Sequence, residues 1–395
     1  MRNSVKKVLC LVLALALMVP CFASCGKSEL NVPAFSEDTI KIGASGPLTG
    51  GAAVYGIAVK NGASLAVHEI NEAGGLDGIM LSFEMYDDQH VPANVATGYA
   101  NLADKNMQIS LGCVTSGPCL EFVKLADDDN MFVLTPSASA DDVPSANGVN
   151  NETVYQMCFA DNNQGTVAAQ TIKDNFPGKS VGVFYLTGDA YSEGIKNNFV
   201  SAFGEDNIVT MQTFNENDSD FTTQINALKD CELIFMPIYY TPASNFMVQA
   251  KGKVANDAIY FGCDGFDGID SAEGFDITDI PQQVSMLSHF NSKATEGAAK
   301  DYVDKYTENF GTDTLNMFGA AAYDCVYAIF NALKAAKAAG ATVNGSVSAS
   351  DMCNMLMAQF NGDFTFSGVT GNDIKWEDTG YVNKDAVVYI IKNAD

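Results

Sequence analysis

A serine, a glycine and a proline stand together at Ser116-Gly117-Pro118, ahead of a stretch with helical periodicity. Proline suits the first position of a helix, because its fixed φ matches the helix and its missing N–H needs no partner there. The Ser116 hydroxyl and the N–H groups ahead of Pro118 would then lie at the positive end of a helix dipole, which binds anions. This segment could therefore hold a carboxylate, although Ser116 could also be a plain helix cap.

Other polar side chains follow predicted strands. Ser137 and Ser139 come after the apolar stretch Met131–Leu134, and Tyr239 and Asp264 each follow another such stretch. Open α/β sheets bind ligands at the carboxyl ends of their strands. We therefore expect these residues to face a binding cleft. Three alternatives stay open: Ser139 could cap the turn that follows it, Asp264 could cap a glycine-rich turn, and Tyr239 could pack into the core.

The known motifs of catalytic and nucleotide-binding sites are absent or broken. There is no G-x-S-x-G nucleophile elbow. Gly178-Lys179-Ser180 ends like a P-loop, but Lys173 occupies the place of its first glycine. Gly262, Gly265 and Gly268 are spaced three apart, which is not the dinucleotide fingerprint. The three His residues show no metal-ligand spacing with Cys, so we expect no catalysis, no cofactor and no metal.

The composition limits the class of protein. The chain has 395 residues, with 22 Lys and Arg against 48 Asp and Glu, and a formal net charge of -26. Its length fits one large or two medium domains. With 47% hydrophobic and 18% charged residues, it can bury sizeable cores, which excludes global disorder. The acidic balance argues against DNA, RNA and anionic lipid headgroups as partners, because these bind basic surfaces.

Apolar stretches alternate with helical periodicity along the chain, which predicts parallel sheets covered by helices on both faces. We therefore predict an α/β protein with two doubly wound lobes. The predicted strands are Ile40–Ser45, Met80–Tyr86, Ile109–Leu111, Met131–Leu134, Val154–Phe159, Val181–Tyr185, Ile208–Phe214, Leu233–Met236, Ile259–Gly262, Ile374–Trp376 and Ala386–Ile391. The predicted helices are Tyr55–Ala73, Pro92–Asp104, Pro118–Asp127, Gln164–Asn175, Ser192–Phe203, Ala294–Asn309, Met317–Ala339 and Ser350–Phe360.

The first 24 residues have the pattern of a secretory signal peptide. They begin with basic residues and no acid, and an apolar run follows from Val8 to about Ala23. This run is too short to be a confident membrane span. Small residues then precede Cys25, which resembles the site where a bacterial lipoprotein is cut and lipid-modified. We predict a signal peptide at 1–24 and a lipidated Cys25 with a tether at 25–38; an ordinary signal peptide is the alternative.

The remaining cysteines do not form a disulfide framework. They are scattered and odd in number, and most lie in apolar stretches, so we expect buried free thiols. Only Cys113 and Cys119 are close enough in sequence to suggest a bridge, and this question stays open. The seven are Cys113, Cys119, Cys158, Cys231, Cys263, Cys325 and Cys353.

Several short motifs occur in a characteristic order. They are Ile40-Lys41-Ile42-Gly43, Gly46-Pro47-Leu48-Thr49-Gly50, Asn61-Gly62-Ala63, Glu69-Ile70-Asn71, Tyr86-Asp87-Asp88-Gln89, Thr115-Ser116-Gly117-Pro118, Thr135-Pro136-Ser137-Ala138-Ser139, Asp161 with Gln164-Gly165, and Tyr191-Ser192-Glu193-Gly194. Their order and spacing resemble the branched-chain amino acid (Leu/Ile/Val) binding proteins of ABC transporters, which have the type I periplasmic-binding fold. The resemblance extends over about Thr39 to Lys392.

This resemblance implies two Rossmann-like lobes joined by three hinge crossovers, with lobe 1 at 39–157 and 286–370, and lobe 2 at 158–285 and 371–395. It implies an amino acid ligand in the cleft between them. Ser116 matches the serine that binds the ligand carboxylate. Ser137 would offer a backbone carbonyl, and Ser139 a hydroxyl, to the ligand. Asp264 matches the acid that pairs with the ammonium. Aromatic residues of the pocket would be Tyr191 and Tyr239 from lobe 2, together with Tyr55 and Phe266.

The chain also departs from the family pattern. Well-known members carry a disulfide between the positions of His90 and Cys113, which cannot form here. Gln156 stands where many relatives have Arg, so local hinge contacts must differ. Ser139 replaces a common Thr, and Asp264 replaces a common Glu, so Asp264 could contact the ligand through a water.

We predict a substrate-binding lipoprotein of an ABC importer on the outer face of the bacterial cytoplasmic membrane. It would bind an amino acid, with a branched-chain one favoured, and deliver it as a monomer to permease subunits. The alternative is a sensor of the same fold for an amide or a small organic or aromatic acid, which signals to a partner. A secreted hydrolase is a third hypothesis, which the missing nucleophile motifs disfavour.

Overall fold

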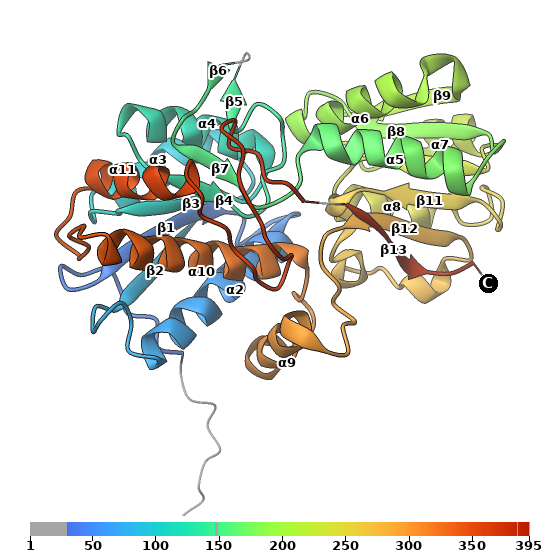
Figure 1. The fold of residues 1–395 in the computed structure, drawn as a ribbon. Helices are drawn as coiled ribbons and strands as arrows, with labels where there is room; N and C mark the ends of the chain where they lie inside the picture. The colour runs from blue at the N-terminus through green and yellow to red at the C-terminus, as the bar shows by residue number, and fades with distance from the viewer. Residues whose placement is uncertain (1–29, 147–148, 385, 395) are drawn as a thin grey trace, which may run out of the picture.

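The chain folds into two α/β lobes that lie side by side (Figure 1). The computed structural model describes residues 30–146, 149–384 and 386–394. The predicted signal peptide and Cys25 therefore lie outside the described residues. Within the described part, no helix is both long enough and apolar enough to span a membrane.

The first lobe is built on a parallel five-stranded sheet in the order β2-β1-β3-β4-β7. One face is covered by α2, which packs against α10, and by α11, while α3 and α4 pack on the other face. The strands are β1 (Ile40–Gly46), β2 (Leu81–Asp87), β3 (Ile109–Cys113), β4 (Val133–Thr135) and β7 (Val154–Gln156). The helices are α2 (Ala53–Glu72), the short η1 (Pro92–Asn94), α3 (Val95–Ala103), α4 (Ser116–Asp128), α10 (Met317–Ala338) and α11 (Ala349–Phe360). A small hairpin joins β5 (Ser145–Ala146) and β6 (Val149–Asn150).

The second lobe has a six-stranded sheet in the order β13-β12-β11-β10-β8-β9, in which β13 alone runs antiparallel. Helices α5 and α6 pack together, as do α7 and α8. The strands are β8 (Val181–Leu186), β9 (Ile208–Phe214), β10 (Leu233–Met236), β11 (Ile259–Gly262), β12 (Gln283–Ser288) and β13 (Val387–Lys392). The helices are α5 (Asp161–Asn175), α6 (Ala190–Phe203), α7 (Thr222–Leu228), α8 (Tyr240–Ala250) and the short η2 (Glu205–Asn207), η3 (Asp264–Phe266), η4 (Ile269–Ser271) and η5 (Ile277–Asp279). Helix α9 (Gly297–Phe310) follows and packs on α2.

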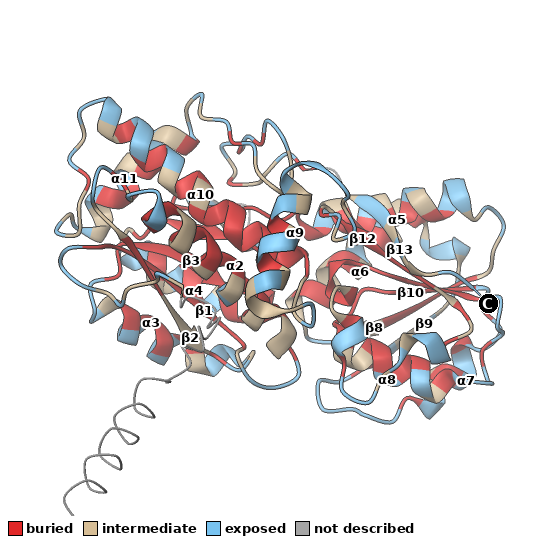
Figure 2. Cartoon of the chain, turned by 90° about the horizontal axis from the view of Figure 1, so that it is seen from below, coloured by how far each residue is buried: buried red, intermediate tan, exposed pale blue. Residues whose placement is uncertain are grey.

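Burial explains why the strand predictions succeed. All four residues of β10 and of β11 are buried, since helices cover both faces of the sheet. Figure 2 shows the buried residues concentrated in the strands and on the inner sides of the helices. Continuous apolar runs are what such doubly covered strands require.

The chain crosses between the lobes after β7, after β12 and ahead of β13. Strand β12 was not predicted, and it runs through the predicted boundary at 285/286. Its sequence mixes Gln and Ser with apolar residues, and hydrogen bonding to β11 and β13 places it in the sheet. Residues 374–376 form isolated bridges instead of the predicted strand. Trp376 still packs on the first lobe, against Phe360, beyond the predicted boundary at 370/371.

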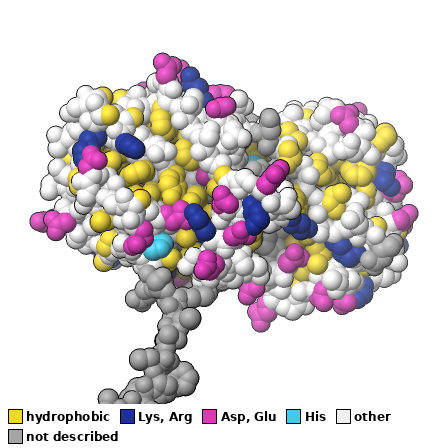
Figure 3. All heavy atoms as spheres, turned by 60° about the horizontal axis from the view of Figure 1, so that its bottom comes forward, with side chains coloured by type: hydrophobic (Ala, Val, Ile, Leu, Met, Phe, Trp, Pro, Cys, Tyr) yellow, Lys and Arg dark blue, Asp and Glu magenta, His cyan; other side chains and the backbone are white. Residues whose placement is uncertain are grey.

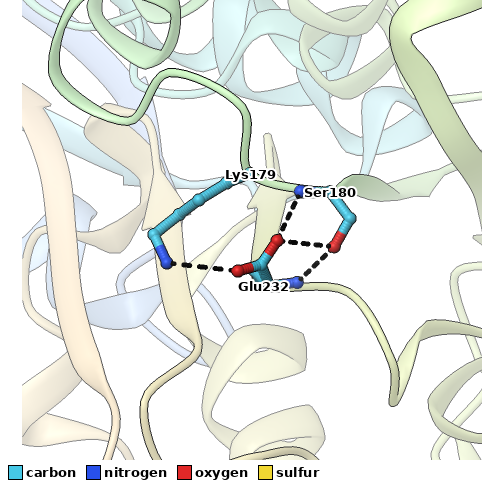
Figure 4. A network of polar contacts seen from close by, with 3 residues as sticks. All are labelled: Lys179, Ser180 and Glu232. Atoms are coloured by element: carbon cyan, nitrogen blue, oxygen red, sulfur yellow. Dashed lines mark hydrogen bonds and ion pairs between the residues drawn. The ribbon is translucent and has the colours of Figure 1, made fainter.

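The segment that ends like a P-loop lies at the start of β8, at the edge of the sheet away from the strands' carboxyl ends. Ser180 donates from its N–H and its hydroxyl to Glu232, over 2.9 and 3.2 Å, and Lys179 lies 3.7 Å from the same carboxylate (Figure 4). These residues therefore connect β8 to β10. They precede a strand, whereas a phosphate-binding loop must open a helix.

Charged side chains are mixed on the surface. On the face shown in Figure 3, acidic side chains are spread over both lobes, with Lys side chains among them. One ion pair joins Lys305 of α9 to Glu69 of α2 over 3.0 Å. Such partly exposed pairs contribute little to stability, about 0–1 kcal/mol.

A buried lysine links the first and third crossovers. Lys384 donates from Nζ to the Met157 carbonyl over 2.6 Å and to the Thr370 hydroxyl over 2.7 Å. The Thr370 hydroxyl in turn donates to Asp324 of α10. Burial lowers the pKa of Lys384 to about 8, and the charge of Asp324 opposes this shift.

Replacing Lys384 with methionine is expected to lower the free energy of unfolding by about 3 kcal/mol, because Asp324 and the Met157 carbonyl lose a buried partner. Urea denaturation of the two proteins measures this difference. Lys375→Met is the matched control, since Lys375 is exposed on the same connecting segment. Equal unfolding midpoints for all three proteins would contradict the prediction.

Candidate ligand-binding site

A small cavity lies between the two lobes, at the carboxyl ends of both sheets. Six of the residues predicted from the sequence line it, which are Tyr55, Ser116, Ser137, Tyr191, Tyr239 and Asp264. The other lining residues are Val114, Thr115, Gly265 and Phe318. Of these, Phe318 is the second residue of α10 and is about 200 residues from Ser116, so no local pattern could have indicated it.

The first lobe presents the N-terminus of α4 to this cavity. The helix begins at Ser116, so Pro118 is its third residue and not its first. The N–H groups of a helix's first turn have no partner within the helix. The Ser116 hydroxyl accepts a hydrogen bond from the Ala140 N–H over 3.1 Å and keeps its own proton for a further bond. This end of the cavity therefore suits a carboxylate.

The second lobe presents Asp264, which opens η3 directly after β11 and is 1% exposed. Its Oδ1 accepts a hydrogen bond from the Tyr191 hydroxyl over 2.7 Å, and its N–H donates to Gln164 over 3.1 Å. Its Oδ2 is buried without a hydrogen-bond partner among the described residues. Desolvation raises the pKa of Asp264 to about 6, although the Tyr191 hydrogen bond lowers it. A cation in the cavity would satisfy both the free oxygen and the buried charge.

Aromatic rings form the rest of the wall. Tyr239 stacks on Tyr191, with ring centres 4.9 Å apart, and Tyr55 packs edge-on against Phe318 at 4.9 Å. The Tyr55 hydroxyl donates to the Gly265 carbonyl over 2.5 Å, so a helix of the first lobe is bonded to the second lobe across the cleft. An apolar ligand side chain can pack among these rings.

Two predicted site residues lie outside the cavity lining. Phe266 is fully buried behind β11, where its ring fills the space left by Gly262. Ser139 is buried with its hydroxyl unpaired among the described residues, and its side chain lowers the pKa of Asp161. Direct contact of Ser139 and Phe266 with a ligand stays a prediction.

The positions that depart from the expected pattern also lie near the site. The His90 ring bonds the Thr115 hydroxyl over 2.8 Å and packs edge-on against Tyr239. Gln156 donates to the carbonyls of Ala138 and Ala140, over 2.8 and 3.2 Å, and so holds the loop that carries Ser139. The seven cysteines of the described residues are buried and unpaired, Cys113 and Cys119 included. Among the same residues, no group of side chains could hold a metal ion.

Comparison with known proteins identifies the family. A family model described as periplasmic binding protein matches residues 39–393, which is most of the chain. The chain belongs to the periplasmic binding protein family. The predicted fold class, two doubly wound α/β lobes of the type I periplasmic-binding kind, is confirmed. Membership in this family implies an extracytoplasmic location.

Among the relatives of this periplasmic binding protein is the leucine-, isoleucine-, valine-, threonine-, and alanine-binding protein of Pseudomonas aeruginosa. The two are 28% identical over 234 residues, which cover 58% of this chain and 61% of the relative. This chain thus spans about three fifths of that relative's length.

Solved structures share the fold over a longer range. The branched-chain amino acid transporter substrate binding protein LivJ from Streptococcus pneumoniae, in complex with isoleucine, superposes with a TM-score of 0.75 at 25% identity, covering 90% of this chain and 96% of LivJ. A solute binding protein from R. palustris, in complex with benzoate, superposes with a TM-score of 0.76 at 19% identity, covering 90% of this chain and 94% of that protein. The second likeness concerns the fold alone.

Proposed function

We propose that this periplasmic binding protein is the substrate-binding lipoprotein of an ABC importer and that it binds an amino acid with an apolar, branched side chain. One observation carries the proposal: Asp264, a buried acid with one unpaired carboxylate oxygen, lines the same cavity as Ser116 at the N-terminus of α4. An anion-binding end and an acid at one small site match the two charges of a zwitterion. The protein would perform no catalysis.

The cavity also favours an apolar side chain. Tyr55, Val114 and Phe318 line it from the first lobe and Tyr239 from the second. Burying a leucine-sized side chain contributes about 1.5–3 kcal/mol. The ligand would touch both lobes, and it therefore stabilises the closed arrangement over the open one, which the permease can distinguish.

An organic or aromatic acid fits this site less well, although the R. palustris neighbour holds benzoate. Such a ligand has a carboxylate but no cation, so Asp264 would stay buried without a partner. An unpaired buried charge costs several kcal/mol unless the group takes up a proton.

Isothermal titration calorimetry of the purified protein tests the proposal. We expect leucine, isoleucine or valine to bind far more tightly than 4-methylpentanoate, the deaminated analogue of leucine, and than benzoate. Equal binding of leucine and 4-methylpentanoate would exclude an amino acid receptor and point to the organic-acid alternative.

The predicted lipid anchor at Cys25 can be tested separately. In cells, Cys25→Ala is expected to release the protein into the medium or to leave the precursor uncut, because the predicted lipid acceptor is lost. Metabolic labelling with a fatty acid, followed by fractionation, measures this, and Ser28→Ala in the predicted tether is the control. Unchanged labelling and membrane retention of the Cys25→Ala protein would refute the lipoprotein assignment.

A further inference from the structure

A second carboxylate beside the cleft has no partner. Asp161 is the first residue of α5, directly after the first crossover, and it is 0% exposed. Neither of its carboxylate oxygens makes a hydrogen bond within the described part of the chain. Desolvation raises the pKa of Asp161 well above its usual range, and the Ser139 side chain partly opposes this shift.

Within the described residues, the charged groups with the largest effects on Asp161 are other acids. The charges that raise its pKa come from Asp264 of η3, Asp141 of the loop after β4, and Asp189 at the start of α6. Thiols and phenols complete its titratable surroundings, namely those of Cys158, Cys263, Tyr239 and Tyr381. A buried acid with only acids and neutral groups around it is costly to ionise.

Hydrogen bonds tie Asp161 to the ligand site on both sides. Its N–H donates to the Ser139 carbonyl over 2.9 Å, which joins α5 of the second lobe to the first lobe. One turn further along α5, Gln164 accepts from the Asp264 N–H. The first turn of α5 is therefore hydrogen-bonded both to the loop that carries Ser139 and to η3, which carries Asp264. These are the two segments that we expect to contact the ammonium of the ligand.

Space for the carboxylate comes from a glycine of α6. A Cβ added at Gly194 would lie 2.7 Å from Asp161 Oδ2. The absence of a side chain at Gly194 thus lets the carboxyl group lie against the first turns of α6, and substitution there would displace it.

We propose that Asp161 is a positioning residue of the binding site. Its carboxyl group and its contact with Ser139 act, together with Asp264, on the cationic group of the ligand. The cleft therefore requires a ligand with an ammonium group. This inference rests on the proposed function. Burial disfavours the ionised form of Asp161, whereas an ammonium in the cleft favours it, so any proton that the carboxyl group holds leaves to solvent when the ligand binds.

Proton release separates the two acids. At pH 7.5 Asp264 is already ionised, because its pKa is about 6, so it has few protons to release when the ligand binds. Calorimetry of leucine binding at pH 7.5, in two buffers of different ionisation enthalpy, counts the protons released. We expect the parent to release more protons than Asp161→Asn, which keeps the size of the side chain.

Affinity gives the second readout. For Asp161→Asn we expect leucine to bind at least about tenfold more weakly and 4-methylpentanoate to bind as in the parent or more tightly. Gly194→Ala should have the same selective effect without removing a charge, because it displaces the carboxylate. Asp174→Asn is the control with unchanged selectivity, since that carboxylate is exposed on the last turn of the same helix, α5.

Two results would refute the inference. One is a parent that releases no more protons on binding leucine at pH 7.5 than the Asp161→Asn protein does. The other is an Asp161→Asn or Gly194→Ala protein in which both ligands weaken equally, which indicates a structural role only. A parent with no preference for leucine over 4-methylpentanoate is a separate outcome, because it refutes the proposed function itself.

Discussion

Replacing Asp264 with asparagine is expected to weaken leucine binding by about 2–5 kcal/mol, which is a factor of about 30 to several thousand. Asparagine keeps the size of the side chain and can still accept from the Tyr191 hydroxyl, but it removes the charge that faces the cavity. Calorimetry of the parent and the variant at pH 7.5 measures the difference. A variant with parental affinity would show that the ligand's ammonium lies elsewhere.

The same substitution should not harm the ligand-free protein. The pKa of Asp264 is about 6 in the folded chain, above its ordinary value of about 3.9. The folded state therefore binds more protons than the unfolded state between these pH values, so this contribution to stability is full below about pH 4 and is lost as the pH rises through 6. At pH 7 we expect Asp264→Asn to melt at or above the temperature of the parent without ligand.

Acid should weaken binding for the same reason. Below about pH 6, Asp264 is protonated in the free protein and must lose that proton before it can pair with an ammonium. Leucine affinity should therefore fall as the pH falls through 6, by up to about tenfold per pH unit. Asp270→Asn, on an exposed side chain of the neighbouring η4, is the control and should keep both the affinity and its pH profile.

The second large effect is expected for the free energy of unfolding, when Gly62 is replaced at the contact between α2 and α10. A Cβ at Gly62 would lie 1.9 Å from the Gly319 carbonyl oxygen of the facing helix. Two backbones meet here, so no side chain can move aside. We expect Gly62→Ala to lower the free energy of unfolding by about 3 kcal/mol or more, because the helices must separate.

Alanine is the better helix former, by about 1 kcal/mol, so local helix propensity alone predicts the opposite sign. Urea denaturation decides between the two effects. Lys60→Ala, on the exposed side of the same helix, is the control and should change stability little. A Gly62→Ala protein as stable as the parent would show that the helix contact is looser than the structure indicates.

The order of elements and much of the site followed from local sequence. Strands β9, β10 and β11 were predicted to the residue; for β10 and β11 the reason is that a strand buried on both faces needs a continuous apolar run. The rule that ligands bind at the carboxyl ends of such strands directed attention to Ser137 and Asp264, which both line the cavity. Family resemblance supplied the expected roles of these residues and the two-lobed arrangement.

Tertiary structure alone decided how distant segments meet. Strand β12 has a mixed sequence, and its neighbours β11 and β13 determine it. The motif Asn61-Gly62-Ala63 was visible in the sequence, but the reason for its glycine is a helix some 250 residues further on. The resemblance indicated Phe266 as a pocket residue, but only the tertiary structure shows that its buried ring packs against Gly262 of β11.

The raised pKa values of the acids near the site are a further feature that only the tertiary structure decided. From sequence, Asp161 and Asp264 are two acids among 48. Their raised pKa values arise from desolvation, which depends on every segment that packs around them and on the closure of two lobes. Local patterns determine which residues stand at the ends of strands and helices, because burial and hydrogen bonding within one element repeat with its period. Which of those residues share a buried cavity depends on contacts between segments more than a hundred residues apart, and no local pattern records them.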